Sequence, residues 1–231
     1  MQTLTLEYVL EGRQRGYQFT SPTTGVPPEM LKQIWRSAMP RGKAWGEPRY
    51  RSANSLKCFT LEESGKGRVA ACEVSGTDQI DEMGRTGIRR ALIHVFTFEE
   101  HAAYLAARLA ALPAAITQEA ERKLRSHDWE LLFRKHSNAR RPATLWKPQT
   151  ILVSDYTPEK WRFVEACLLM LVTRSTFLTN LIELTPKLNP FADRALAFTT
   201  LALDPDDDGR LIALPADRAA RLKNVPFIEI A

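Results

Sequence analysis

The segment 77–94 constrains the fold of this chain more than any other. It places two aspartates, one glutamate and two glycines among three arginines, and an apolar run at 91–96 follows at once. Gly84 and Gly87 can adopt backbone conformations that other residues avoid. Arg85 lies between them, with acidic side chains close enough to pair with it. The pattern predicts a rigid polar corner that leads directly into a β-strand.

Alternating apolar and polar residues predict several strands in the first half of the chain. Residues 3–10 and 17–20 flank a turn that contains glycine, and residues 56–61 and 68–74 flank another. Short turns of this kind are typical of β-hairpins. With the run at 91–96, these segments predict an antiparallel sheet.

Helix signals separate these strands from the rest of the chain. Two prolines begin a helix over 27–38. Thr97 begins the next one with a capping box, in which its hydroxyl accepts a free N–H and Glu100 reaches back to the Thr97 N–H. Pro113 begins a third helix, and Ser126 caps a fourth.

The last third of the chain mixes strands with one long helix. Residues 150–153 predict a short strand, and Thr157 begins a helix with one apolar face. Residues 195–203 and 210–214 predict a hairpin around an acidic turn, and residues 227–230 predict a final strand.

Antiparallel strands together with segregated helices predict the α+β class. A chain of 231 residues can bury a full core either as one large domain or as two small ones. The segment 138–148 is the best linker candidate. In the two-domain arrangement, an N-terminal α+β domain covers 1–137 and a small C-terminal subdomain covers 149–231.

The composition indicates a reduced, cytoplasmic protein. The three cysteines are far apart and lack metal-ligand spacing, which indicates free thiols. Glutamates interrupt the N-terminal apolar residues, unlike in a signal peptide. The longest apolar run, 163–172, is too short to span a bilayer, which takes about 20 apolar residues. We therefore expect no membrane association.

The corner is the leading candidate for a binding site. The planar guanidinium of Arg85 can clamp a phosphate, a carboxylate or a protein partner, and neighbouring arginines can extend the site. In the structural alternative, Arg85 only ties the corner together, and His94 is a hydrogen-bonded core residue. The predicted site consists of Asp81, Gly84, Arg85, Gly87, Arg89, Arg90 and His94.

Two basic segments offer a different site. Residues 101–150 hold nine Lys or Arg against four Asp or Glu, within a chain of net charge +5. The basic part of this stretch, 122–147, contains two tryptophans, and the segment 36–51 contains Trp45 and Tyr50. Basic residues with aromatics can follow a nucleic-acid backbone, although solvated helix faces are the alternative. The nucleic-acid candidates are Arg122, Lys123, Arg125, Arg134, Lys135, Arg140 and Arg141.

Metal and catalytic motifs are weak. Asp204 to Gly209 matches the start of a calcium loop, but Pro215 occupies the place of the usual glutamate, so an acidic turn is the alternative. Zinc-protease, phosphate-loop and Cys-x-x-Cys patterns are missing from the sequence. We expect no cofactor and no metal. An anion-dependent enzyme built on Arg85 and His94 is the weakest hypothesis.

Three short motifs within residues 5–101 resemble a known family. They are Gly16-Tyr17-Gln18, Thr20-Ser21-Pro22, and the corner Asp81-x-x-Gly84-Arg85-x-Gly87 followed by His94. Together they resemble the N-terminal domain of GTPase-associated proteins from bacterial conflict systems. Those proteins lie beside GTPases or related NTPases in antiphage defence loci. The resemblance implies an adaptor or sensor rather than an enzyme.

Two functions from different classes follow. The first is an adaptor or regulatory protein of an NTPase-centred antiphage system, which contacts a protein partner, such as the NTPase, through the corner. It predicts that Arg85→Ala abolishes partner binding. The second is a nucleic-acid-binding module that uses 36–51 and 122–147. It predicts binding that weakens steeply as salt rises.

Overall fold

In the part of the chain that the structure describes, nine strands form one mixed sheet, and the fold is α+β as the sequence predicted. The computed structural model describes residues 2–10, 16–40, 43–63, 66–125, 150–173, 197–204, 211–219 and 227–230. The strands are β1 (Gln2–Val9), β2 (Gly16–Phe19), β3 (Ser55–Glu63), β4 (Lys66–Gly76), β5 (Arg89–Phe96), β6 (Thr150–Ser154), β7 (Phe198–Thr199), β8 (Leu211–Pro215) and β9 (Phe227–Glu229). The helices are α1 (Pro28–Ser37), α2 (Phe98–Ala110), α3 (Ala114–Arg125), α5 (Pro158–Thr173) and α7 (Ala216–Ala219), with the 3-10 turns η1 (Lys43–Gly46) and η2 (Pro48–Tyr50).

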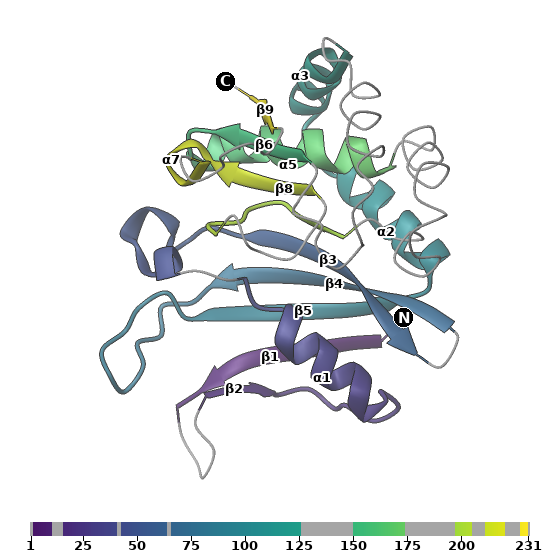
Figure 1. Cartoon of the computed structure of the whole chain (residues 1–231), viewed down its shortest axis with the longest axis vertical. Coiled ribbons are helices and arrows are strands. Elements are labelled where there is room, and N and C mark those ends of the chain that lie inside the picture. The colour runs from purple at the N-terminus through teal and green to yellow at the C-terminus, as the bar shows by residue number, and fades with distance from the viewer. Residues whose placement is uncertain are drawn as a thin grey trace, which may run out of the picture.

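The strands run across the sheet in the order β2-β1-β5-β4-β3-β7-β8-β6-β9 (Figure 1). The first five pair antiparallel, as their alternating sequence predicted. In β5, Ala91, Ile93 and Val95 are buried on one face, whereas Leu92 and His94 on the other face are only half-buried. The two faces of this part of the sheet therefore differ in chemistry.

Helices cover the two faces unequally. On one face, Met30 and Ile34 of α1 pack in a cluster with residues of β1, β3, β4 and β5. On the other face, Leu105 of α2, Leu124 of α3 and Leu168 of α5 join a larger cluster that extends to β6 and β8. In Figure 1, α2, α3 and α5 gather at one side of the sheet, away from α1. The helices are thus segregated, as predicted.

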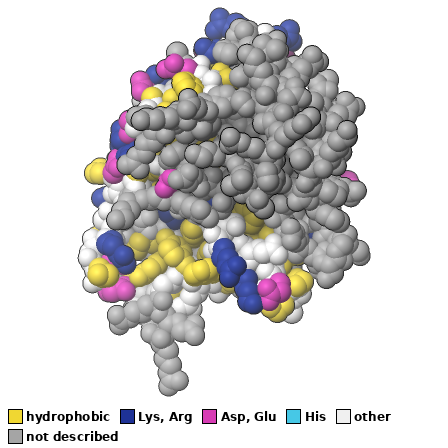
Figure 2. All heavy atoms as spheres, in the orientation of Figure 1, with side chains coloured by type: hydrophobic (Ala, Val, Ile, Leu, Met, Phe, Trp, Pro, Cys, Tyr) yellow, Lys and Arg dark blue, Asp and Glu magenta, His cyan; other side chains and the backbone are white. Residues whose placement is uncertain are grey.

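One side chain of α1 reaches β2, the strand at the outer edge of the sheet. Trp35 of α1 is 52% exposed, and its indole N–H donates to the carbonyl oxygen of Tyr17 at 3.3 Å. Figure 2 shows hydrophobic and charged side chains side by side over the lower part of this view, where Figure 1 places α1 and β1. This hydrogen bond ties α1 to the edge strand.

The predicted capping box at Thr97 is present at the start of α2. The Glu100 N–H donates to Thr97 Oγ1 at 3.3 Å, and the Thr97 N–H donates to Glu100 Oε2 at 2.9 Å. Helices α3 and α5 also begin where Pro113 and Thr157 predicted them. The helix predicted after Ser126 lies outside the described residues.

The hairpin predicted between 195–203 and 210–214 is wrong, because β7 and β8 pair in parallel. Only Phe198 and Thr199 belong to the ladder, although beyond it the Thr200 N–H still donates to the Leu56 carbonyl of β3 at 2.9 Å and the Ala202 N–H to the Ala213 carbonyl of β8 at 2.8 Å. Every residue of β8 is buried. Such continuously apolar strands are typical of parallel pairs covered on both faces, whereas a hairpin with one solvated face alternates.

The two halves of the chain share this sheet, joined where β3 pairs with β7. Beside this pairing, the Leu56 N–H donates to Thr200 Oγ1 at 2.8 Å, and the Ser55 hydroxyl donates to the Leu201 carbonyl at 2.9 Å. The linker candidate 138–148 lies in a part of the chain that is not described. The division into two subdomains therefore stays a prediction.

Candidate functional site

The predicted corner is a loop that joins β4 to β5 and projects from one end of the sheet (Figure 1). We call residues 77–88 the corner loop. The Thr77 N–H donates to the Ile88 carbonyl at 3.0 Å and closes its base. Nearer the tip, the Asp81 N–H donates to the Arg85 carbonyl at 3.1 Å. The loop is therefore closed by backbone hydrogen bonds both at its base and near its tip.

A single buried carboxylate holds the tip. Asp81 Oδ1 accepts the backbone N–H groups of Met83 at 2.9 Å and Arg85 at 2.8 Å. Asp81 Oδ2 accepts from Arg85 Nε at 2.5 Å. Burial by itself raises the pKa of Asp81, but these hydrogen bonds outweigh burial and hold the pKa below its usual value. At neutral pH the ionised carboxylate therefore fixes the turn.

Both glycines of the corner adopt the backbone conformation that the sequence predicted. Gly84 has φ 75° and Gly87 has φ 84°, a region that favours glycine. Gly87 also packs closely on η1, because a Cβ placed on it would lie 2.6 Å from the Gly46 Cα atom. The hydroxyl of Thr86 donates to the Gly46 carbonyl at 3.4 Å. The corner loop thus rests on η1.

The tip of the corner loop presents apolar side chains and one guanidinium to solvent. Met83 is 73% exposed and Ile80 is 55% exposed. The side chain of Arg85 is 65% exposed, although its Nε is held by the buried carboxylate. On one flank, the Tyr8 hydroxyl donates to Glu82 Oε2 at 3.2 Å. The backbone of the tip is fixed, while the side chains of Ile80, Met83 and Arg85 remain accessible.

Arg89 has a different role from the one the sequence suggested. It is 3% exposed, and its guanidinium donates to the carbonyl oxygens of Ala53 at 2.6 Å, Tyr50 at 2.5 Å and Trp45 at 3.1 Å. Its central carbon lies 4.4 Å from the centre of the Trp45 ring. Burial lowers the pKa of Arg89 to about 10, so it stays protonated at neutral pH. The expectation that Arg89 extends the binding surface is therefore wrong, because its guanidinium is buried and both of its terminal nitrogens donate to backbone carbonyls of the same chain.

Arg90 and His94 lie on the sheet rather than on the corner loop. Arg90 is exposed, and its Nε lies 2.8 Å from Glu7 Oε1. His94 is half-buried, with Nδ1 3.2 Å from Thr3 Oγ1 and Nε2 3.7 Å from Glu73 Oε1. The structure thus places the seven predicted residues in three locations: the corner loop, the buried base and the face of the sheet.

A polar cluster beside His94 escaped the sequence analysis. The Tyr104 hydroxyl donates to Glu73 Oε1 at 2.6 Å, and Arg108 Nη1 lies 3.2 Å from Glu73 Oε2. Arg108 Nε donates to Glu165 Oε1 at 2.8 Å. The only available signals were the lone Glu73 in a predicted strand and the helical spacing of Tyr104 and Arg108. Neither signal says that β4, α2 and α5 meet.

A buried cysteine and histidine lie together without forming a nucleophile. His101 Nε2 lies 3.4 Å from Cys58 Sγ, and both side chains are buried. Burial lowers the pKa of His101 to about 4 and raises the pKa of Cys58 well above its usual value. Both groups are therefore neutral at physiological pH, and no thiolate forms. All three cysteines are free and buried.

Part of the predicted nucleic-acid site can be placed. Arg122, Lys123 and Arg125 lie in the last turns of α3. Arg122 lies 3.9 Å from Glu119 and Arg125 lies 2.9 Å from Glu121, so intrahelical pairs offset part of the charge. The other four candidates, Arg134, Lys135, Arg140 and Arg141, lie outside the described residues.

The aromatic side chains of the segment 36–51 are not available for stacking on bases. Trp45 and Tyr50 are buried in the larger core cluster. Arg49 pairs with Asp217 at 2.5 Å, which ties η2 to α7. The expectation that this segment combines basic and stacking groups is therefore wrong for its two aromatic residues.

The remaining sequence motifs contribute no site among the described residues. Asp204 is described, but the rest of the acidic turn is not. In the ranges that the structure covers, no three His, Cys, Asp or Glu side chains gather as metal ligands. None of the helices seen there has the length and apolar character needed to cross a bilayer.

Comparison with known proteins adds no relative. No family model matches the chain, and no curated protein or solved structure matches it either.

Proposed function

We propose that this protein is an adaptor or regulatory component that binds another protein through the corner loop. The observation that carries the proposal is the exposure of Met83, Ile80 and Arg85 on a tip whose backbone the buried Asp81 carboxylate holds. Methionine and arginine are enriched at protein interfaces. A preorganised loop also loses little conformational entropy on binding.

The proposed partner is an NTPase of a bacterial antiphage defence system. Support for this class comes from the resemblance of residues 5–101 to the N-terminal domain of GTPase-associated proteins. The chemistry of the tip suits a partner surface with a shallow apolar pocket for Met83 and a carboxylate for the Arg85 guanidinium. The proposal requires no catalysis by this chain.

The test is affinity capture from the native cells, followed by measurement with the purified partner. Met83→Ser and Arg85→Ala should each weaken binding of the captured protein by about tenfold or more, as expected for central interface residues. Arg36→Ala, at an exposed position of α1, is the matched control and should bind as the wild type does. Retention of the same partner by both loop variants would remove the corner loop as the recognition element.

A nucleic-acid interface is the second candidate, and a groove between α3 and α5 favours it. This groove of about 730 Å³ is lined by Arg122, Lys123 and Lys160, with Phe163 among them. Cations beside an aromatic ring can follow a phosphate backbone. Glu119 and Glu159 also line the groove and oppose that use.

Polarisation with labelled single-stranded DNA and RNA at low salt distinguishes the two functions. A nucleic-acid module should bind, lose affinity steeply with rising salt, and weaken further when Arg122 and Lys123 are both changed to Gln. The adaptor proposal expects no binding that depends on these two residues.

A further inference from the structure

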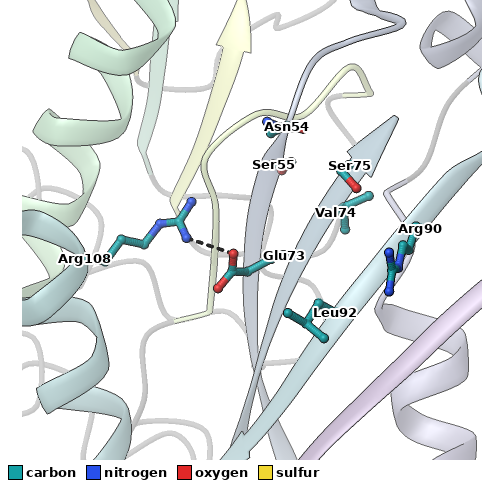
Figure 3. A pocket seen from close by; sticks show the side chains of 8 residues that line it. All are labelled: Asn54, Ser55, Glu73, Val74, Ser75, Arg90, Leu92 and Arg108. Atoms are coloured by element: carbon teal, nitrogen blue, oxygen red, sulfur yellow. Dashed lines mark ion pairs between the residues drawn. The ribbon is translucent and has the colours of Figure 1, made fainter. Parts of the chain in front are cut away.

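A polar pocket lies on the face of the sheet that α1 does not cover. It has a volume of about 310 Å³, and β3, β4, β5 and α2 contribute its walls. Figure 3 shows Arg108 on one side, Arg90 on the other, and Glu73 between them above Leu92. The pocket is separate from the corner loop.

The pairing of the strands explains why charged side chains meet here. Glu73 is paired with Leu92, and Ser75 is paired with Arg90, across β4 and β5. Directly paired residues of antiparallel strands project from the same face. The opposite face of these strands carries the buried apolar residues that contact α1. The polar floor is thus a consequence of strand alternation.

Surrounding side chains hold Glu73 and Arg108 in place. The carboxylate of Glu73 receives the Tyr104 hydroxyl at 2.6 Å and lies 3.2 Å from Arg108 Nη1. Arg108 is also anchored by Glu165, which lies 2.8 Å from its Nε. Neither contact uses Arg108 Nη2. A group held at two points keeps its orientation, as a binding residue must.

Arg90 is held less tightly. Its contact with Glu7 uses Nε at 2.8 Å, and its side chain is 53% exposed. Exposed pairs of this kind contribute little and exchange readily. The guanidinium can therefore present its two terminal nitrogens to a molecule in the pocket, and Ser75 and Asn54 line the same space.

We propose that this pocket binds the oxyanion of a small polar metabolite, a phosphate monoester or a carboxylate, between Arg90 and Arg108. The planar donor forks of two arginines suit such a group. Glu73 then accepts from a hydroxyl or amino group of the same molecule. The volume lies at the lower end of the range of about 300–1,000 Å³ typical of ligand pockets, which favours a small metabolite over a polymer.

The experiment measures binding of two probes by calorimetry and by NMR of the arginine side chains. Glycerol 3-phosphate represents the phosphate monoesters, and malate represents the carboxylates. We expect saturable binding of at least one probe, with shifts of the Arg90 and Arg108 Nε–H signals. Arg90→Gln should weaken this binding by about tenfold or more, as expected for loss of a charge-assisted hydrogen bond.

Two variants serve as controls. Arg36→Gln removes the same charge from α1, on the opposite side of the sheet, and should bind like the wild type. Met83→Ser changes the corner loop and should also bind like the wild type, so failure of the adaptor function would leave this result unchanged. Because loss of Arg108 can unfold the protein, Arg108→Lys is used there, and it should weaken binding while the fold is retained.

The proposal is overturned if neither probe saturates in the millimolar range, which is the weakest affinity expected of such a site. It is equally overturned if Arg90→Gln and Arg36→Gln bind the probes alike, since the anion would then be held elsewhere.

Discussion

Arg85 and Arg89 are four residues apart in the sequence, yet one guanidinium group is exposed to solvent and the other is buried. The Arg85 side chain is 65% exposed and is held by one carboxylate at the tip of the corner loop. Arg89 is buried at the base of the loop and donates to three backbone carbonyls. One arginine is available to a partner, and the other connects η1, η2 and β5.

The comparison shows that the neighbourhood, not the residue type, decides the role of an arginine. Arg89 reaches its carbonyls by crossing Gly76 on the adjacent strand, where an added Cβ would lie 2.9 Å from Arg89 Nη1 and 1.8 Å from the Arg51 carbonyl oxygen. The tip has no such enclosure, because nothing lies within 4 Å of a Cβ placed on Gly84. A rigid base thus carries an exposed tip.

The largest expected effect comes from removing the buried guanidinium. Arg89→Met should lower the free energy of unfolding by about 3 kcal/mol or more, because three buried carbonyls lose their donor and each unsatisfied buried group costs about 1–3 kcal/mol. Urea denaturation measures the change. Arg90→Met is the matched control and should cost about 1 kcal/mol or less, as for exposed ion pairs. Equal midpoints for the two variants would contradict the assigned role of Arg89.

The next largest expected effect is a difference in stability cost between alanine substitutions at the two glycines of the corner. Gly84→Ala should cost about 1–2 kcal/mol, since only the positive φ opposes a Cβ there. Gly87→Ala should cost more, because its Cβ would also lie 2.6 Å from the Gly46 Cα atom and 2.7 Å from the Trp45 carbonyl oxygen. Denaturation of both variants checks the order. If Gly84→Ala is the more damaging change, the corner loop does not rest on η1.

A smaller, local effect is expected at low pH. Because the pKa of Asp81 is lower in the folded loop than in the unfolded chain, its contribution is complete above the unfolded pKa of about 4. That contribution is lost as the pH falls through the lower, folded pKa. NMR titration should show the Met83 and Arg85 backbone N–H signals moving together in acid. Asp81→Asn should show the loosened loop already at neutral pH. If neither acid nor this substitution moves the two backbone N–H signals, the Asp81 carboxylate does not hold the turn.

The smallest effect on stability is expected for the exposed arginine. Arg85→Ala should leave the urea midpoint unchanged within error, because the guanidinium is solvated and the Asp81 carboxylate keeps its two backbone N–H donors. Binding of the proposed partner should nevertheless weaken by about tenfold or more. A large fall in stability would mean that Arg85 holds the fold, as Arg89 does, and would weaken its assignment to recognition.

Much of the fold could be predicted because its signals are local. The alternation in β1, β3, β4 and β5, the capping box at Thr97 and the positive φ of Gly84 and Gly87 each depend on neighbouring residues. The parallel pairing of β7 with β8 could not be predicted, since the turn-like sequence between them equally suits a hairpin. In the structure they pair in parallel, and every residue of β8 is buried.

The features of the candidate site also divide into those that local sequence predicts and those that depend on distant segments. The sequence predicted that an acidic neighbour pairs with Arg85, because several lie within a few residues of it, and the structure shows that Asp81 is that partner. The burial of Arg89 was not visible, since Ala53, Tyr50 and Trp45 reach it from a segment that is irregular in sequence. The cluster of Glu73, Tyr104 and Arg108 likewise joins elements that the sequence keeps apart.

The amino-acid sequence by itself therefore determined most of the strands, the starts of α1, α2, α3 and α5 and the conformation of the corner, because short-range sterics and hydrogen bonds govern them. Only the tertiary structure decided which arginine is sealed, which is exposed and which lines a pocket. Those outcomes depend on the face of the sheet that each strand residue occupies and on the helix or 3-10 turn packed above it. Contacts between distant segments fix both.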